Sequence, residues 1–486
     1  MYVGDQQVAV AQGFLLVDSR SGGNLHCRAM SDLFFDLALL PDGWAERVRV
    51  SVRPDGLIES VTPGGEPAEA EVVPGVVVPG VPNLHSHAFQ RAMSGLAERG
   101  SERGDSFWGW RERMYAFLER MSPDDVEAVA AQLQVELLRH GYTHVAEFHY
   151  LRNDVDGGAY GDPIEMARRV LAAAETSGIG TTLLPVLYRT SDFGGKPPTH
   201  GQARFVATVD ALLNDVAILR KSSQGDVRHN VGLAMHSLRA VPPEDLDLVV
   251  RAMGAIDPEG PIHIHIAEQR REVDACVAWS GARPVEWLLS NAPVDERWCA
   301  IHATHMTIGE TLALAETGAV VGLCPTTEAN LGDGVFPFAD YAAVEGRWGV
   351  GTDSHISVSP VADLRMLEYS QRLVTQERNI AAGQSDRSSG RALLEGAWKG
   401  GAQACGAPVG AISEGSRADF VALDTEHTSM IGRRGDEWLD SWIFSGEDSA
   451  VRDVMACGTW VVRDGRHARQ EEVAERFRDV ARRLRR

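Results

Sequence analysis

The sequence predicts an α/β protein in which a (β/α)8 TIM-type barrel is accompanied by a small β-sandwich domain built from both ends of the chain. Two observations carry this prediction. Through the middle of the chain, eight short apolar runs alternate with longer amphipathic segments, and both flanks contain short strand-like runs that lack helical spacing. Near-continuous apolar strands separated by helices indicate a parallel sheet buried on both faces, and eight such strands close a barrel.

The expected barrel strands are short and rich in branched apolar residues. They cover residues 76–84, 143–149, 179–187, 231–236, 262–266, 299–303, 319–324 and 348–352. Between the first two strands we expect a helix, because Ser122 is a favoured N-cap residue and Pro123 suits the first turn. This helix runs through residues 127–139 and stops at Gly141.

The two flanks are expected to pair with each other, because both consist of short strands and turns. The strand-like runs are residues 37–40, 48–52 and 57–61 before the barrel and 418–423 and 451–463 after it. We therefore predict a β-sandwich domain from residues 30–75 and 411–465, a catalytic barrel from residues 76–410, and a solvated surface helix within residues 466–486.

Charge and cysteine usage exclude several classes of partner and compartment. The chain has 47 Lys and Arg against 68 Asp and Glu, a formal net charge of −21, which argues against nucleic acid or an anionic membrane as a partner. Asp5 precedes the apolar run 8–17, where a signal peptide requires Lys or Arg, and no apolar stretch approaches the roughly 20 residues of a membrane span. The scattered cysteines indicate reduced thiols in a soluble cytoplasmic protein: Cys27, Cys276, Cys299, Cys324, Cys405 and Cys457.

Histidines and an aspartate lie where several of the expected barrel strands end. The first strand ends in Asn83-Leu84-His85-Ser86-His87, and because side chains alternate along an extended segment, His85 and His87 point the same way. The fifth strand contains His263 and His265, and the eighth is followed by Asp353. Catalytic groups of such barrels lie at the carboxyl ends of the strands, so three imidazoles and one carboxylate predict a zinc site with room for a water.

The choice between neighbouring histidines is less direct. His263 and His265 share a face, and we favour His265 as the ligand because it is nearer the carboxyl end of its strand. His263 is expected to be a hydrogen-bonded interior residue, and His305 to have a supporting role. His302, at the end of the sixth strand, is either a further ligand or a neutral base and electrophile beside the metal.

Glu268, three residues beyond His265, is the expected general acid and base. It lies in the loop over the metal, where burial raises the pKa of a carboxyl group toward neutrality. The alternative is a surface glutamate that pairs with Arg270 or Arg271.

The chain also resembles a known family. His85-Ser86-His87, His265-x-x-Glu268, His302 and Gly351-Thr352-Asp353-Ser354 resemble the amidohydrolase superfamily in its metal-dependent deaminase branch, which holds one divalent metal. The fourth strand carries His236 and no lysine, consistent with one metal. From about Met30 onward the chain is similar to the formimidoylglutamate deiminases. The runs that carry this closer resemblance are residues 83–93, 106–111, 146–150, 236–241, 263–269 and 327–334.

The resemblance implies a barrel of the metal-dependent hydrolase type that converts N-formimidoyl-L-glutamate and water to N-formyl-L-glutamate and ammonia in histidine degradation. It implies one Zn²⁺, or another divalent metal, held by His85, His87, His265 and Asp353. It also implies catalytic roles for Glu268, His302 and Asp353, and a pocket for a small dianionic substrate. The residues expected to line that pocket are Gln90, Arg111, Tyr150, His236 and Arg239. Members of the superfamily are often dimers, so we expect a homodimer.

Elementary chemistry agrees with such a substrate. Formimidoylglutamate carries two carboxylates, and the planar forks of Arg111 and Arg239, which lie near strand ends, suit bidentate binding of carboxylates. Tyr150 offers one more hydrogen bond, although Arg111 taken alone fits an ordinary amphipathic helix equally well. We expect Asp353 or His302 to accept the proton of the attacking water and Glu268 to protonate the nitrogen that leaves.

Two other functions fit part of the pattern. A deaminase of a nucleobase or related heterocycle would share the metal residues and Glu268, but it would not need two arginines directed at carboxylates. A non-catalytic barrel would have lost one of the metal or catalytic residues, and all are present.

Residues 1–29 have no counterpart in the resembled family, and Met30-Ser31-Asp32 looks like a natural beginning. We therefore expect residues 1–29 to be a leader, from an upstream start codon or added for expression.

Overall fold

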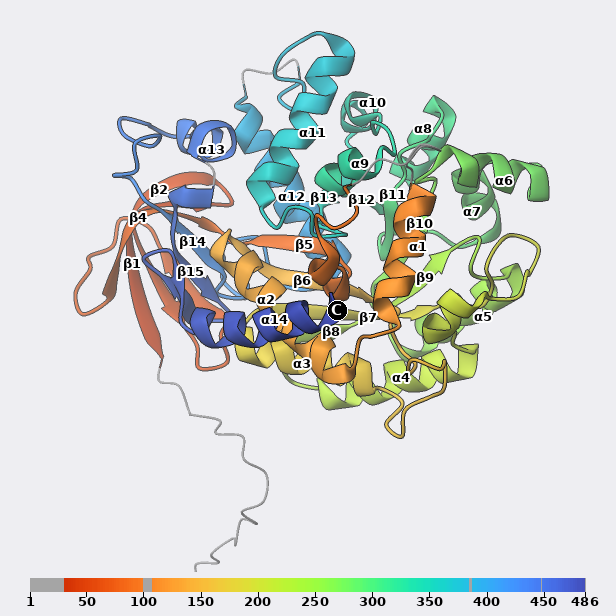
Figure 1. Ribbon diagram of the computed structural model, residues 1–486. Helices are drawn as coiled ribbons and strands as arrows, with labels where there is room; N and C mark the ends of the chain where they lie inside the picture. The colour runs from red at the N-terminus through yellow and green to blue at the C-terminus, as the bar shows by residue number, and fades with distance from the viewer. Residues whose placement is uncertain (1–29, 99–106, 384–386, 447, 486) are drawn as a thin grey trace, which may run out of the picture.

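The computed structural model describes residues 30–98, 107–383, 387–446 and 448–485 and contains the predicted barrel (Figure 1). Eight parallel strands are neighbours in one sheet, in chain order, while β8 (His229–Val231) pairs with β7 outside this path. The barrel strands are β5 (Val81–Ser86), β6 (Tyr142–His149), β7 (Gly180–Leu187), β9 (Leu233–Ser237), β10 (Ile262–Ile266), β11 (Trp298–His302), β12 (Val320–Leu323) and β13 (Arg347–Val350). A parallel bridge between Ser86 and Asp353 brings the first and last strands together, so the prediction of a barrel is confirmed.

Helices surround the barrel (Figure 1). The helix expected before the second strand is α2 (Pro123–Arg139), and it begins as predicted, because Ser122 and Asp125 form a reciprocal capping box. The remaining α-helices are α1 (Phe107–Leu118), α3 (Glu165–Ser177), α4 (Val209–Ser222), α5 (Pro243–Ile256), α6 (Arg270–Ser280), α7 (Pro284–Asn291), α8 (Ile308–Glu316), α9 (Pro325–Leu331), α10 (Phe338–Ala343), α11 (Pro360–Thr375), α12 (Ser389–Cys405), α13 (Glu437–Ser441) and α14 (Gln470–Leu484).

Both ends of the chain build a second, separate sheet, as predicted. Its eight strands are β1 (Ser31–Leu40), β2 (Gly43–Val52), β3 (Ile58–Thr62), β4 (Glu71–Pro79), β14 (Phe420–Leu423), β15 (Val451–Ala456), β16 (Thr459–Arg463) and β17 (Arg466–His467). The antiparallel pair β4 and β14 joins the two ends into one continuous hydrogen-bonded sheet. The sheet encloses its own apolar cluster, in which the rings of Phe35 and Phe420 meet edge to face at 5.4 Å. Alternating apolar residues do not reveal whether such a cluster lies between two sheets or within one.

The first expected barrel strand, residues 76–84, is wrong as a single element. β4 ends at Pro79 in the small sheet and β5 begins at Val81 in the barrel. The backbone N–H of Gly80 donates to Asp419 at 2.9 Å, whereas that of Val81 donates to Gly141 at 3.0 Å, so the chain changes partners at Gly80. A side chain at Gly80 would collide with Thr143. The apolar run is continuous because both segments are buried, and burial does not record which sheet a strand joins.

The C-terminal helix α14 is docked and not merely solvated, which corrects the prediction for the tail. Arg476 and Arg483 form ion pairs with Glu127 and Asp125 of α2, and Val473 is buried.

None of the described helices combines the length and the apolar character that a bilayer span requires. Five cysteines of the described residues are buried, while Cys27 and the expected leader 1–29 lie outside them.

Candidate metal and catalytic site

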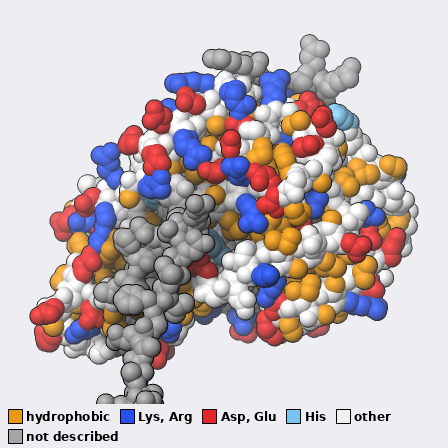
Figure 2. Space-filling model, turned by 90° about the horizontal axis from the view of Figure 1, so that it is seen from below, with side chains coloured by type: hydrophobic (Ala, Val, Ile, Leu, Met, Phe, Trp, Pro, Cys, Tyr) orange, Lys and Arg blue, Asp and Glu red, His pale blue; other side chains and the backbone are white. Residues whose placement is uncertain are grey.

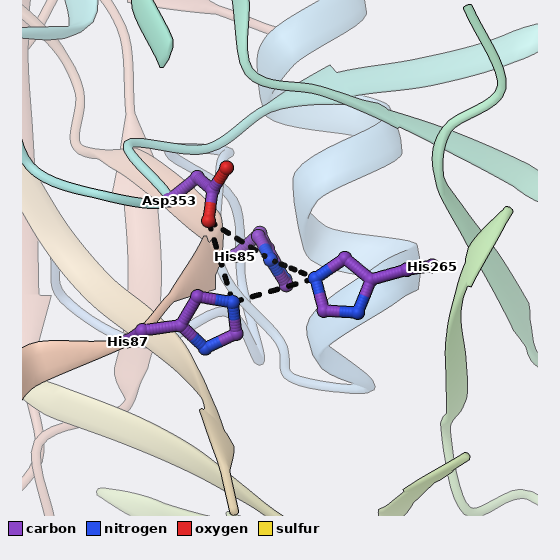
Figure 3. A group of neighbouring side chains, drawn as sticks. All are labelled: His85, His87, His265 and Asp353. Carbon is purple, nitrogen blue, oxygen red and sulfur yellow. Dashed lines mark hydrogen bonds and ion pairs between the residues drawn. The ribbon is translucent and has the colours of Figure 1, made fainter. Parts of the chain in front are cut away.

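Four side chains converge at the carboxyl end of the barrel, as the sequence predicts (Figure 3). His85 lies one residue before the end of β5, His87 follows that strand, His265 comes from β10 and Asp353 follows β13. The Nε2 atom of His265 lies 3.0 Å from that of His85 and 3.3 Å from that of His87. Asp353 Oδ1 lies 3.5 Å from His85 Nε2 and 3.3 Å from His87 Nε2. All four side chains are buried, so they form one compact set of donor atoms.

The hydrogen bonds on the far side of two rings show that this set fits a cation. His87 Nδ1–H donates to the Phe148 carbonyl at 3.0 Å, and His265 Nδ1–H donates to the His236 carbonyl at 2.9 Å. Burial lowers the pKa of His87 to about 3 and holds that of His265 well below its usual value, so both rings are neutral. Their Nε2 lone pairs therefore face each other and repel unless a cation lies between them. Tetrahedral zinc at its usual bond lengths separates two ligand nitrogens by about 3.3 Å.

Asn83 holds the first and last strands in register behind the ligands. Its Nδ2 donates to Thr352 Oγ1 at 2.7 Å, and its Oδ1 accepts from the backbone N–H groups of His85 and Thr352 at 3.3 and 3.1 Å. Asp353 itself has a φ of +50°, in the left-handed region that residues other than glycine rarely adopt. The surrounding clamp therefore stabilises a strained backbone that turns the Asp353 carboxylate toward the histidines.

Glu147, in β6, is a supporting residue to which the sequence assigned no role. Its carboxylate accepts from Ser86 Oγ at 2.5 Å and from the backbone N–H of Ala88 at 2.8 Å. Ser86 lies between the two ligands of the first strand, so these bonds fix the segment that carries them. Burial raises the pKa of Glu147 to about 7.

Glu268 faces the same cleft and is buried, as the functional interpretation requires. Burial raises the pKa of Glu268 to about 7, and the nearby Asp353 and Glu272 carboxylates act in the same direction. The alternative of a surface ion pair does not describe the structure, because the Arg271 guanidinium lies over the Trp108 ring at 4.4 Å. His263 and His305 lie apart from these four side chains and donate to the carbonyls of Ala404 and Asp333, both at 2.8 Å.

His302 lies beside the ligand set and not within it. Its Nε2 is 3.8 Å from Asp353 Oδ2 and 3.9 Å from Glu268 Oε1. Its Nδ1 lies 3.2 Å from Glu328 Oε1. Burial lowers the pKa of His302, but Glu268 and Glu328 outweigh it and raise the pKa to about 10. Glu328 lies within one of the runs that carry the family resemblance, yet only its position in the fold reveals the contact.

An open cleft of about 550 Å³ joins these groups to all five residues predicted to bind substrate. Arg239 is buried, and its Nε has no hydrogen-bond partner among the described residues; the same holds for Arg111 Nε. Neither guanidinium forms an ion pair with a described carboxylate, and Arg111 stacks on Trp108 at 4.4 Å. Among the described residues, the cleft therefore presents two arginines that no carboxylate contacts directly, and an anionic ligand would supply that contact.

The other predicted substrate residues complete the walls. Gln90 Nε2 donates to the Tyr150 hydroxyl at 2.9 Å, while Gln90 Oε1 is buried without a partner among the described residues. The His236 ring packs against Tyr188 and Tyr150 at centroid distances of 4.6 and 5.5 Å. Phe107 and Trp110 of α1 also line the cleft.

Two family models match the chain. The model of the Amidohydrolase family covers residues 76–461, and the model described as formimidoylglutamate deiminase HutF, N-terminal domain, covers residues 30–72. Formimidoylglutamate deiminase of Pseudomonas aeruginosa is 49% identical over 93% of this chain and 99% of its own length. An 8-oxoguanine deaminase of the same organism is 27% identical over 80% of this chain and 83% of its own length.

Solved structures agree with the fold. An amidohydrolase from Brucella melitensis superposes with a TM-score of 0.88 at 46% identity, covering 93% of this chain and 99% of that one. An adenosine deaminase from Xanthomonas campestris with bound zinc superposes with a TM-score of 0.78 at 20% identity, covering 93% and 98% of the two chains. The second likeness concerns the fold alone.

Proposed function

The chain belongs to the amidohydrolase family and, within it, to the formimidoylglutamate deiminases, and on that premise we propose that it hydrolyses N-formimidoyl-L-glutamate to N-formyl-L-glutamate and ammonia in histidine degradation. The observation that carries the proposal is one cleft that holds both a set of candidate metal ligands and two arginines, Arg111 and Arg239, that form no ion pair with a carboxylate of the described residues. A substrate with two carboxylates and one hydrolysable C–N bond matches both halves of this cleft.

The negative net charge of the chain gives Arg111 and Arg239 particular weight as binding residues for an anionic substrate. The chain has a net charge of −21, and on the face shown in Figure 2 acidic and basic side chains are interspersed. A dianion gains nothing from the net charge of such a protein, so its binding must come from local cations. Arg111 and Arg239 supply two positive charges, and their guanidinium forks match carboxylate geometry.

The metal is proposed to be a single zinc ion held by His85, His87, His265 and Asp353. Three neutral imidazoles and a carboxylate are typical zinc donors, and their spacing matches a tetrahedral arrangement. When bound, such a cation polarises the substrate and makes a coordinated water acidic enough to serve as a nucleophile at neutral pH. Metal analysis of the purified protein tests both the identity and the number of ions.

The side chains around the cation handle the protons. Water attacks the formimidoyl carbon, and Asp353 Oδ2 accepts the proton that the water loses. His302, whose raised pKa of about 10 keeps the ring protonated at neutral pH, offers its Nε2–H as a hydrogen-bond donor beside the attacking water. Glu268, whose pKa is about 7, carries a proton in a large fraction of molecules at neutral pH and donates it to the nitrogen that leaves. The C–N bond then breaks and ammonia departs, while the hydroxyl group that came from the water gives its proton back to Glu268, so that a formyl group remains on the glutamate nitrogen.

A direct substrate panel tests the proposal. We expect ammonia release from formimidoylglutamate, and little or none from 8-oxoguanine, cytosine or adenosine. A heterocycle deaminase is the second candidate because a relative with that activity is 27% identical, but its substrates leave Arg111 and Arg239 without carboxylates. Turnover of a base without turnover of formimidoylglutamate would reverse the assignment. The homodimer and the cytoplasmic location stay predictions, and light scattering of the purified chain tests the first.

A further inference from the structure

We infer that Glu328 is a positioning residue that fixes the His302 imidazole so that its Nε2 faces the reacting atoms. This inference rests on the proposed function, because it assigns Glu328 to the machinery of that same reaction. Glu328 is buried and lies in α9, outside the cleft lining, so it acts through His302 and not on the substrate.

The local fold holds the Glu328 carboxylate rigidly. Pro325 begins α9, and the backbone N–H of Glu328 donates to the Cys324 carbonyl at 2.9 Å. Glu328 Oε1 in turn accepts from the backbone N–H of Cys324 at 2.9 Å. The side chain of Glu328 thus reaches back to the first residue of the helix turn that its own backbone closes, which leaves it few accessible rotamers and gives its oxygen a fixed place.

That fixed oxygen determines how the His302 ring lies. Glu328 Oε1 is 3.2 Å from His302 Nδ1, and the Nδ1–H group therefore donates a hydrogen bond to Glu328. The opposite nitrogen, Nε2, then points toward Glu268 and Asp353, at 3.9 and 3.8 Å. A carboxylate behind an imidazole sets the orientation of the ring and stabilises its protonated form, and losing such a partner typically costs a large part of the rate.

The backbone conformation at His302 is a further reason why its imidazole needs a hydrogen-bond partner to fix its direction. His302 has a φ of +69° and Ala303 a φ of +48°, both in the left-handed region. At these two residues the backbone departs from extended strand geometry. The strand alone therefore does not determine where the His302 imidazole points. A hydrogen bond from a rigid neighbouring element supplies that direction.

The test compares three variants of the metal-loaded enzyme. Glu328→Met removes the acceptor while keeping similar volume, and we expect kcat to fall about 100-fold or more, with KM within about threefold and the metal-to-protein ratio unchanged. Glu328→Gln keeps an acceptor oxygen and should retain kcat within about tenfold. Glu310→Met is the matched control, because Glu310 is also buried and caps the first turn of α8 by accepting from Thr307 at 2.8 Å. It should lower the melting temperature while leaving kcat unchanged.

A double-mutant cycle separates positioning from a merely structural role. In a His302→Ala background, Glu328→Met should lower kcat by less than about threefold, since the residue it positions is gone. Independent, additive losses, equal kcat in the Met and Gln variants, or loss of metal in proportion to activity would each overturn the inference. If wild-type enzyme in the same assay does not release ammonia from formimidoylglutamate, the proposed function itself fails, which is a distinguishable outcome.

Discussion

Asn83 and Thr352, 269 positions apart in the sequence, are joined by two hydrogen bonds. The Asn83 amide donates to the Thr352 hydroxyl, and the Asn83 carbonyl oxygen accepts from the Thr352 backbone N–H. This pair lies directly behind His85 and Asp353, one from the first barrel strand and one from beyond the last. The metal ligands therefore depend on the closure of the barrel, and not only on their own side chains.

Substitution of Asn83 by alanine should weaken both the metal site and the fold. We expect a loss of about 10–100-fold in metal affinity, because a supporting hydrogen bond is removed. We also expect a loss of about 1–3 kcal/mol in the free energy of unfolding, because buried polar groups lose their partner. Competition with a chelator and denaturant unfolding measure the two. Asn153→Ala is the control, since Asn153 is a buried asparagine that donates to Ala203 and Val206 away from the ligands.

Removal of the metal should abolish turnover and lower stability together. The three ligand histidines are neutral and the Asp353 carboxylate faces them, so the folded chain binds a cation that the unfolded chain does not hold in this arrangement. At a free metal concentration 100 times the Kd, binding adds about 2.7 kcal/mol to the free energy of unfolding. Thermal scans with and without a chelator, followed by metal readdition, test this. Full activity after exhaustive chelation would contradict it.

The convergence of His85, His87, His265 and Asp353 could be predicted from the sequence, because each of these residues lies at or just beyond the end of a barrel strand. In a barrel, the carboxyl ends of all strands meet on one face, so position along the chain translates into proximity. The same reasoning placed Arg239 in the cleft, since it follows His236 at the end of β9.

The contacts of Glu328 and Glu147 could not be predicted in this way. The first depends on the turn by which α9 begins, and the second on the turn that follows β5, where the backbone N–H of Ala88 meets the Glu147 carboxylate. The change of sheet at Gly80 was also hidden, because Val76–Val78 and Val81 are equally apolar. Such features are set by backbone partners and local geometry, which a pattern of apolar and polar residues does not record.

Glu268 should control one limb of the pH profile. As a general acid it must carry a proton, and its raised pKa of about 7 leaves it protonated at lower pH and ionised at higher pH. The value of kcat/KM should therefore fall as the pH rises through this region, and a bound cation, which favours the carboxylate, moves the limb toward lower pH. Glu268→Gln should retain the metal, lose about 10²–10⁴-fold in kcat and lose this limb. A Gln variant with the wild-type profile would assign the limb to another group.

Arg239 offers the sharpest test of the substrate, because its effect should depend on a carboxylate that a chemist can remove. Replacement by alanine should lower kcat/KM for formimidoylglutamate by about 1.5–3 kcal/mol, the range for a lost hydrogen bond to a charged group. Lysine should restore little of this lost transition-state stabilisation, since a point charge does not reproduce the bidentate fork.

A second substrate shows which carboxylate Arg239 binds. With formimidoylglycine, which lacks the side-chain carboxylate, the alanine variant should lose less kcat/KM if Arg239 binds that group. If Arg239 binds the other carboxylate, the loss should be the same for both substrates. An alanine variant with wild-type kcat/KM for formimidoylglutamate would show that Arg239 holds neither carboxylate, and the argument for a dianionic substrate would then depend on Arg111 alone.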